Sequence, residues 1–429
     1  MAGIGFELRR LVETRTISGF AGAAFSGVVI VAGPWILTIL SLSAAQSLPF
    51  FAEGEVALAF TGAMVWTLAA SLCLSAGFLH IFVRLSADLI YEGKRAEAAC
   101  LLVKVAAATA AVSLPIGWAL ASLLIANGAH AMVFRLGFAL LLAAANVLWA
   151  AMMTVTAIKR YGLVLAAYAA GMGLMYWLAA LLGPALGAAG ALLGLAAGYA
   201  ATAIILIAAA LGGLGLAPLP GAAARLAAYG RRYRHLALTG AAYALGTWID
   251  KFLLWGVRGS RAEGTWFSVY PPYDNAFFLA NLALIPGLIY FTISTETGFS
   301  LDLRRFLGFL AHRRRPEVEA ARRRLGRSAR SALAAQSGFQ AVVSVALSLL
   351  GPYITACLGA PAGAFLLLLW GGFFQLILLT ALNMLFYLEL YAAAAITGLC
   401  FLGVNALISG LIAFGPAPIP LGLPYLAAG

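Results

Sequence analysis

Eleven long runs of apolar residues constrain this chain more than any other feature of its sequence. The runs lie near 18–43, 57–83, 99–125, 132–158, 162–182, 189–212, 237–257, 266–293, 335–358, 362–386 and 391–413. As a helix, each is long enough to cross the ~30 Å hydrocarbon core of a bilayer. Charged residues make up 10% of the chain and hydrophobic residues 63%, whereas soluble domains carry about 25% charged residues. The sequence therefore predicts an all-α polytopic membrane protein.

The basic residues between the runs predict how the chain is oriented. If the N-terminus is cytoplasmic, most of the 27 lysines and arginines fall in cytoplasmic segments. A loop on the other side holds only Arg258 and Arg261. Since cytoplasmic loops carry an excess of Lys and Arg, we predict a cytoplasmic N-terminus. The net charge of +12 then follows from the membrane topology and attracts anionic lipids. In the arginine-rich segment 294–334 it does not indicate nucleic-acid binding, because no aromatic stacking platform is interleaved with the arginines.

The runs divide the chain into two halves. Residues 1–17 have the helical spacing of a short interfacial helix, and 18–212 contain six spans. Residues 213–236 combine glycine, proline and a basic cluster, which indicates a cytoplasmic linker. The half 237–429 contains five complete spans and the start of another. Because two six-span halves are a common plan of secondary transporters, we expect twelve spans in total.

Charged residues lie deep inside two consecutive apolar runs. Asp250 and Lys251 stand about seven residues before the end of one run, and Asp274 about eight residues after the start of the next. All three are expected roughly 10 Å below the same membrane face. Ionisable groups at that depth are costly unless they are paired or hydrated, which makes them functional candidates. The Pro271-Pro272 pair predicts a helix break, which membranes tolerate only beside protein or water.

Aromatic and amide side chains stand near these charges in the sequence. They offer the flat faces and hydrogen-bonding groups that suit a sugar. The candidates for a substrate or gating cavity are Trp248, Asp250, Lys251, Trp255, Tyr270, Tyr273, Asp274 and Asn275, with Trp266 at a similar depth. We predict that Lys251 pairs with Asp250 or Asp274 in one state and that rearrangement of this pair gates the outward side. A permanent ion pair that pins two helices is an open alternative.

The longest polar insertion, 294–334, is rich in arginine. Leu303, Phe306, Leu307 and Leu310 share one helical face. The candidates for partner or lipid docking are Arg304, Arg305, Arg313, Arg314, Arg315, Arg322, Arg323, Arg324, Arg327 and Arg330. Such a helix is expected to lie along the cytoplasmic membrane surface or to dock a cytoplasmic partner. A solvated charged face that only fixes orientation is the alternative.

No pattern for catalysis or cofactor binding is present in the sequence. The four cysteines and four histidines are dispersed, which argues against a disulfide framework and a metal site. The phosphate-binding pattern GxxxxGK[ST] is absent, and so are a serine, histidine and acid grouping and an Asp-x-Asp motif. We therefore predict no enzymatic activity, no metal and no cofactor.

Three stretches resemble one known family. They are MAGIGFELRRL with the following SGFAGAAFSGVVIVAGPWILTILSL, the GTWIDKFLLW segment with Asp250 and Lys251, and YPPYDNAFFLANLALIPGLIYF before the arginine-rich loop. Together they resemble the PelG-type family of Pel exopolysaccharide exporters, over essentially the whole chain. This family is similar to the multidrug, oligosaccharidyl-lipid and polysaccharide flippases.

The resemblance implies a fold, a cargo and partners. The fold is MATE-like, with twelve helices in two six-helix lobes around a central cavity, in the bacterial inner membrane. The cargo is an amino-sugar polysaccharide that passes to the periplasm during biofilm matrix production. The implied partners are a cytoplasmic glycosyltransferase of PelF type and membrane scaffold proteins of PelD and PelE type. The twelfth span is missing from this sequence, where the family pattern has one.

Two other functions remain open from the sequence. One keeps the fold and changes the cargo, giving an ion-coupled flippase of lipid-linked oligosaccharides or a drug efflux transporter, with Asp250 or Asp274 as the coupling carboxylate. Dependence of transport on a proton or sodium gradient would favour it. The other is a membrane scaffold that only anchors a synthase through the segment 294–334. Deleting that segment would then abolish activity, while substitutions in the cavity would have no effect.

Overall fold

The computed structural model describes residues 17–294, 299–312, 315–415 and 420–429. The predicted interfacial helix at 1–17 lies outside this part, apart from Ile17. The helices are α2 (Ile17–Gln46), α3 (Gly54–Tyr91), α4 (Arg95–Leu124), α5 (Ala131–Ala157), α6 (Tyr161–Leu186), α7 (Ala188–Leu214), α8 (Ala222–Arg232), α9 (Arg234–Arg258), α10 (Pro271–Leu282), α11 (Ile285–Ser294), α12 (Ser300–His312), α13 (Arg315–Leu358), α14 (Ala362–Tyr387), α15 (Tyr391–Phe414) and α16 (Leu423–Ala428). A 3-10 helix, η1 (Pro49–Ala52), and the strands β1 (Ser260–Arg261) and β2 (Ser268–Val269) complete the described structure.

Nine helical segments of the described residues are long and apolar enough to cross a membrane, with α10 and α11 counted as one segment. The remaining two predicted spans are also helical, since α2 has 30 residues and α9 has 25. Helix α9 is less apolar than the other spans because it contains Asp250, Lys251 and Arg258. The prediction of an all-α, multi-pass membrane protein is confirmed.

The chain forms two compact units. The first contains the described residues up to Ala32, Pro271–Leu390 and Val404–Gly429, and the second contains Gly33–Tyr270 and Tyr391–Gly403. The predicted linker at 213–236 is thus internal to the second unit. The reason is that α9 packs on α3: a Cβ on Gly77 would lie 3.0 Å from the Ala237 carbonyl oxygen, and one on Gly240 2.9 Å from that of Ala76.

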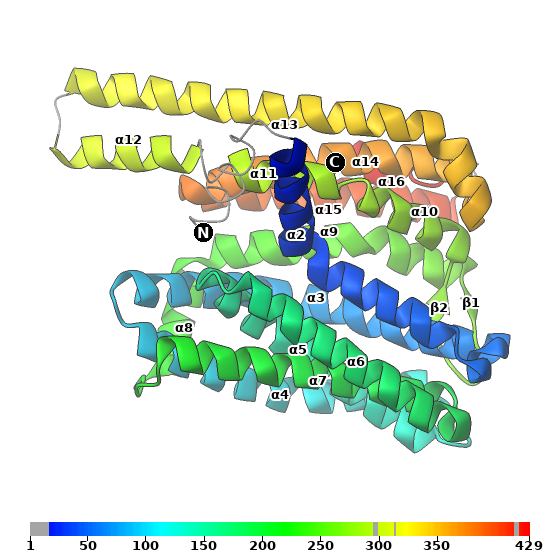
Figure 1. The fold of residues 1–429 in the computed structure, drawn as a ribbon. Coiled ribbons are helices and arrows are strands. Elements are labelled where there is room, and N and C mark those ends of the chain that lie inside the picture. Colours follow the sequence, from blue (N-terminus) through cyan, green and yellow to red (C-terminus); the bar gives the residue numbers. More distant parts are fainter. Residues whose placement is uncertain (1–16, 295–298, 313–314, 416–419) are drawn as a thin grey trace. The chain divides into compact units, whose positions relative to one another are not determined.

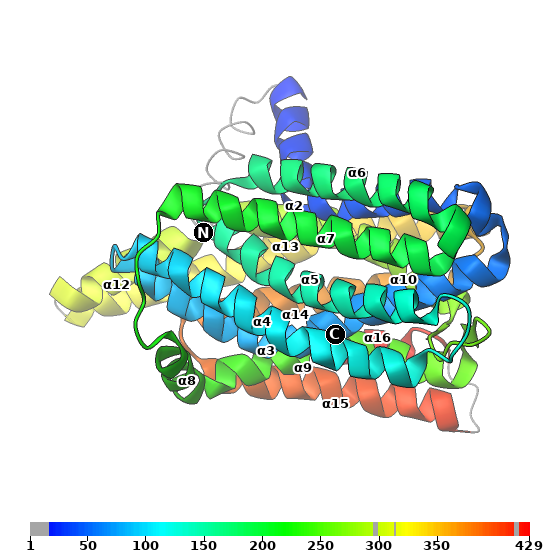
Figure 2. The same ribbon diagram turned by 90° about the horizontal axis from the view of Figure 1, so that it is seen from below.

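The core of the second unit is the bundle α4–α7, which Figures 1 and 2 show side by side. Its helices approach closely through glycine. A Cβ on Gly171 of α6 would overlap the hydroxyl of Thr202 on α7, and a Cβ on Gly194 of α7 would lie 3.0 Å from the backbone nitrogen of Ala179. Small residues allow this approach, because van der Waals packing replaces the hydrophobic effect between helices in lipid. The alanine- and glycine-rich spans therefore serve helix packing.

A short β-hairpin interrupts the predicted span 266–293. Ser260 pairs with Val269 and Arg261 with Ser268 in antiparallel register. The span consequently begins at Pro271, since proline fits the first turn of a helix, where no backbone donor is required. Asp274 therefore lies in the first turn of α10 and not eight residues into a span, which corrects the depth predicted from the sequence.

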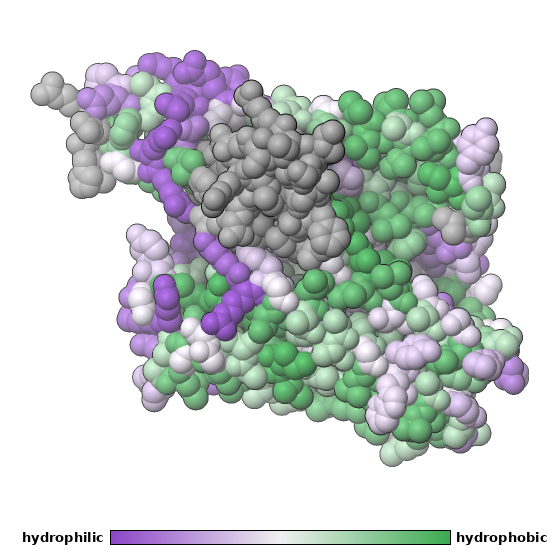
Figure 3. Space-filling view, in the orientation of Figure 1, coloured by the Kyte–Doolittle hydropathy of each residue, from purple (hydrophilic) through white to green (hydrophobic). Residues whose placement is uncertain are grey.

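The first unit contains the basic segment. Helix α13 has 44 residues and is continuous from the arginine-rich part into the membrane span. Helix α12 packs antiparallel to its N-terminal half (Figure 1), with Leu303 against Leu325 in a small cluster that includes Phe299. Figure 3 shows hydrophilic residues concentrated over this hairpin. At about 1.5 Å per residue α13 is roughly 66 Å long, about twice the hydrocarbon thickness.

Candidate functional site

Asp250 and Lys251 form a buried ion pair on α9. Their exposed fractions are 0% and 2%. The Lys251 Nζ donates hydrogen bonds to Asp250 Oδ1 at 3.1 Å and Oδ2 at 3.3 Å, and to the Thr247 carbonyl oxygen at 2.8 Å. All three residues belong to the same helix, so these contacts by themselves connect no two helices. Burying the pair in a membrane span is costly, because the desolvation free energy of two charges can exceed the free energy of their mutual attraction.

Aromatic side chains pack around this pair within the second unit. The Lys251 Nζ lies 5.4 Å from the centre of the Trp248 ring, a cation–π distance. The Trp255 ring lies 5.5 Å from that of Trp66 on α3 and 6.2 Å from that of Trp248. The Trp66 Nε1 donates to the Ser268 carbonyl oxygen at 2.7 Å, which ties α3 to the hairpin. A cluster of tryptophan rings therefore lies beside the pair.

The predicted aromatic residues differ in how far they are buried. Trp255 is only 1% exposed, so it contributes to the packed core and presents no open face. Trp248 and Tyr270 are half-buried. Trp266 is 59% exposed and stacks under the Arg261 guanidinium, 4.4 Å from the ring centre. Of the aromatic candidates in this unit, Trp248 has its ring at a cation–π distance from the buried Lys251 ammonium.

The other predicted residues belong to the first unit. Tyr273 is fully buried and stacks on Phe277, with ring centres 6.5 Å apart. Asp274 is half-buried and Asn275 exposed, both in the first turn of α10. Tyr273, Asp274 and Asn275 thus come together at one helix start, while Trp248, Asp250, Lys251 and Trp255 come together on α9. The predicted pairing of Lys251 with Asp274 stays a prediction.

A second buried polar group was not found from the sequence. Gln336 and Gln340 on α13 are 1% and 0% exposed. The Gln340 Nε2 donates to the Ala283 carbonyl oxygen at 2.9 Å, at the break between α10 and α11, and the Thr380 hydroxyl lies 2.9 Å from Gln336 Oε1. The sequence contains a pattern that could have predicted this polar group, because Gln336, Gln340 and Ser344 recur every four residues on one face of a span.

The arginines of the basic segment fall into distinct environments. Asp302 on α12 accepts from Arg305 at 3.4 Å and from Arg324 of α13 at 3.1 Å, while Arg315 lies 3.5 Å from Glu319. Arg304 and Arg322 are exposed. Arg313 and Arg314 lie outside the described residues. The remaining three, Arg323, Arg327 and Arg330, line a hollow of about 350 Å³ with Gly326.

A comparison with known protein families identifies the family of this chain. The model of the PelG exopolysaccharide exporter family (EPS-E) matches residues 1–428. The chain belongs to the PelG family. Members of this family are exopolysaccharide exporters, so the chain is a membrane transporter and not an enzyme. Among curated proteins, none matches the chain.

Solved structures show the same fold for this PelG-family chain. An inward-facing multidrug resistance MATE family transporter of the MOP superfamily has a TM-score of 0.57 at 13% identity, over 93% of this chain and 92% of that one. A MOP superfamily transporter from Pyrococcus furiosus has a TM-score of 0.53 at 13% identity, over 93% and 90%. The eukaryotic MATE transporter AtDTX14 has a TM-score of 0.54 at 14% identity, over 99% and 93%. At these identities the likeness establishes the MATE-like fold.

Proposed function

We propose that this chain exports a Pel-type exopolysaccharide, an amino-sugar polymer, from the cytoplasm to the periplasm across the bacterial inner membrane. Membership of an exporter family and the MATE-like fold support the transport of polysaccharide. The observation that carries the proposal furthest is the buried Asp250–Lys251 pair beside Trp248. A charge pair inside a span costs energy, which makes it a functional candidate, and aromatic and hydrogen-bonding groups suit a sugar chain.

The proposed orientation follows from the basic turns of each unit. In the second unit, Arg84, Lys94, Lys159 and the α8 segment lie at one end, while the hairpin β1–β2 lies at the other. By the excess of positive charge, the first end faces the cytoplasm. The hairpin end then faces the periplasm, and the polymer leaves on that side.

The proposed gating step is a change of partner for Lys251. In the described state its ammonium is held by Asp250 and by the Thr247 carbonyl. In this proposal the predicted lobes 18–212 and 237–429 move against each other, so the packing of α9 on α3 that holds in the described state changes. Lys251 exchanges contacts as they move. A buried charge can make such an exchange only if each state supplies a partner, because an unpaired charge in a span is prohibitively costly.

The proposed partners are a cytoplasmic glycosyltransferase of PelF type and membrane scaffold proteins of PelD and PelE type. The α12–α13 hairpin supports a docking role. Since α13 continues straight out of its span, its arginines extend along an axis away from the membrane and not along the surface. Arg323, Arg327 and Arg330 share one face, opposite Leu325, and a stripe in this direction suits an acidic protein surface better than a plane of lipid headgroups.

The proposed function is tested by polymer secretion in a strain whose own copy of the gene is deleted. Complementation with the wild-type chain is expected to restore secreted polymer, as measured by lectin binding to the extracellular matrix. The neutral double variant Asp250→Asn/Lys251→Met is expected to reach the membrane at normal levels and to secrete little polymer. Normal secretion by this variant would exclude the gating role of the pair.

A further inference from the structure

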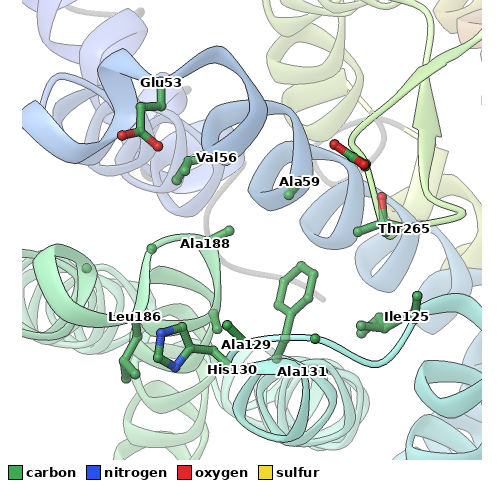
Figure 4. A pocket seen from close by; sticks show the side chains of 18 of the residues that line it. Glu53, Val56, Ala59, Ile125, Ala129, His130, Ala131, Leu186, Ala188 and Thr265 are labelled. Atoms are coloured by element: carbon green, nitrogen blue, oxygen red, sulfur yellow. The ribbon is translucent and has the colours of Figure 1, made fainter.

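The two ends of the second unit differ in what their side chains form. At the hairpin end, a pocket of about 470 Å³ lies between η1, the α4–α5 and α6–α7 turns and the hairpin tip, with Glu53, His130 and Thr265 in its lining (Figure 4). At the opposite end, where α8 precedes α9 (Figure 2), side chains of α3, of the α8–α9 turn and of α15 meet. This second end is the cytoplasmic one in the proposed orientation.

Arg84 on α3 lies at the centre of these contacts. Its Nη1 donates a hydrogen bond to the Tyr391 hydroxyl at 3.3 Å, and its Cζ lies 5.1 Å from the centre of the Tyr233 ring. Tyr391 is the first residue of α15, and its ring meets that of Tyr233 edge-on, with ring centres 5.6 Å apart. One side chain of α3 thus binds both the α8–α9 turn and α15.

Asp88, one turn further along α3, holds this arginine in position. The Asp88 Oδ2 lies 3.4 Å from the Arg84 Nε and accepts a hydrogen bond from the Tyr229 hydroxyl at 3.0 Å. A guanidinium that a carboxylate already orients loses less conformational entropy when it binds further partners. Asp88 and Tyr229 therefore prepare Arg84 for its contacts with the two tyrosines.

The contacts of Arg84 join the two predicted lobes. Arg84 belongs to the lobe 18–212, and Tyr391 belongs to the lobe 237–429. Deeper in the span, a seam of small residues joins the same lobes, since a Cβ on Gly77 of α3 would lie 3.4 Å from the Cβ of Ala241 on α9. Lobes that move against each other must therefore separate both at Arg84 and along this seam.

The contacts of Arg84 are suited to repeated opening. The Arg84 and Asp88 side chains are 29% and 30% exposed, so water can hydrate both charges once the tyrosines have moved away. A hydrogen bond of 3.3 Å is long, and cation–π contacts at exposed sites are weak. Asp250 and Lys251, by contrast, are sealed from water and need a protein partner in every state.

We propose that Arg84, Tyr233 and Tyr391 form a latch on the cytoplasmic side, which opens before the polymer enters between the lobes. Asp88 and Tyr229 are the positioning residues of this latch. The described state of the second unit has the latch closed. This inference rests on the proposed function, because it takes the movement of the lobes and the orientation of the chain from it.

The reactivity of a cysteine in the seam measures how often the latch opens. Ala241→Cys is introduced into the full chain with the four native cysteines replaced by serine. Inverted vesicles are then treated with a membrane-impermeant maleimide, which arrives from the cytoplasmic side. Arg84→Gln is expected to raise the labelling rate roughly fivefold, because the lost contacts shift the equilibrium toward the open state.

Arg225→Gln is the matched control for Arg84→Gln. It removes the same charge at the same end of the unit, but the ion pair that it breaks joins α8 to Glu97 on α4 and leaves α15 untouched. The labelling rate of this variant is expected to equal that of the unsubstituted chain. A general effect of lost positive charge on labelling would instead appear in both variants.

A cross-link tests whether transport requires the lobes to separate. In the same cysteine-free background, Gly77→Cys/Ala241→Cys places two Cβ atoms 3.4 Å apart across the lobes, and Gly398→Cys/Ala242→Cys places two 3.6 Å apart within the lobe 237–429. Both separations are close to those of disulfides. The vesicles are supplied with glycosyltransferase and labelled nucleotide sugar, and the measured quantity is polymer protected from an added glycosidase.

Oxidation of the first pair is expected to abolish protected polymer, and reduction of the same vesicles should restore it. The second pair should protect polymer in both states. The latch is refuted if Arg84→Gln leaves the labelling rate unchanged, if Arg225→Gln raises it equally, or if the oxidised first pair still protects polymer. Failure of the proposed function has a different result: the reduced chains protect no polymer, while labelling still responds to Arg84→Gln.

Discussion

At the scale of single residues, the buried charges are the feature that stability does not explain. Asp250 and Lys251 stand next to each other in the sequence and satisfy each other on one helix. Replacing a buried ion pair by apolar groups is often neutral or stabilising, whereas removing one partner leaves a buried charge alone. The pair should therefore contribute more to transport than to the stability of the fold, and substitutions can separate the two contributions.

The first prediction concerns the stability of α9. Asp250→Asn alone removes the anion beside a buried ammonium and should lower the free energy of unfolding by about 3–5 kcal/mol. Asp250→Asn/Lys251→Met removes both charges and should recover most of that loss. Thermal unfolding in detergent measures both variants. Equal losses in the single and the double variant would contradict this account of the pair.

The second prediction concerns helix packing at glycine. Gly171→Val places a Cβ against the Thr202 hydroxyl and the Gly198 carbonyl oxygen, and should destabilise the second unit by about 1–3 kcal/mol. Gly173→Val is the matched control, because a Cβ there meets no atom within 4 Å. Thermal unfolding is again the measurement. If both variants lose the same stability, helix propensity and not packing is responsible.

At the scale of elements, two helices depart from simple spans. Helix α13 changes environment along its length, from an exposed arginine-rich half to an apolar half, without a break. The segment α10–α11 does break, at Ala283–Leu284 just before Pro286, and the Gln340 amide holds the Ala283 carbonyl. Proline removes a backbone donor, so an external donor at the break is a physical requirement in a membrane.

The third prediction concerns this break. Gln340→Leu removes the donor to the buried Ala283 carbonyl and should cost about 1–3 kcal/mol of unfolding free energy. Ser348→Ala is the control, since that hydroxyl bonds the carbonyl oxygen of Ser344 on its own helix, at 2.8 Å. Thermal unfolding of the two variants provides the comparison. A control that loses as much stability as Gln340→Leu would show that the break needs no external donor.

The fourth prediction concerns the basic hairpin. Arg323→Glu/Arg327→Glu reverses two charges of the stripe on α13 and is expected to reduce secreted polymer at least severalfold, because an acidic partner would be repelled. Arg304→Glu/Arg322→Glu makes the same change of net charge on other faces and should leave secretion near normal. Lectin binding to secreted polymer measures both. A similar reduction in both variants would point to diffuse attraction or topology, not to a docking face.

At the scale of the whole molecule, the hydropathy of the sequence was enough to predict most of the membrane-spanning helices. The apolar runs 362–386 and 391–413 correspond to α14 at Ala362–Tyr387 and α15 at Tyr391–Phe414 within one residue. Lipid enforces this agreement, because every backbone polar group in a span must be satisfied within the helix. The Asp250–Lys251 pairing was also accessible, since a charge this deep in an apolar run requires a partner.

Long-range contacts account for what the sequence did not reveal. The hairpin β1–β2 forms because Ser260 and Val269 pair across a turn, and its short strands carry no clear alternation. The burial of Trp255 depends on Trp66, which is far away in the chain. The division into compact units depends on the packing of α9 against α3. The composition of the segment 213–236 contains no information about that contact. Periodicity identifies a helix, but the partners of its faces become visible only in three dimensions.

The central claim is that this chain is the passage through which the polysaccharide crosses the membrane. Inverted vesicles supplied with the pathway's glycosyltransferase and radiolabelled nucleotide sugar test it directly. The label that becomes protected from an added glycosidase is the measured quantity. The account predicts protected polymer with the wild-type chain and little with Asp250→Asn/Lys251→Met, at equal synthesis. Polymer that stays fully digestible with the wild type, or equal protection in vesicles without the chain, would contradict it.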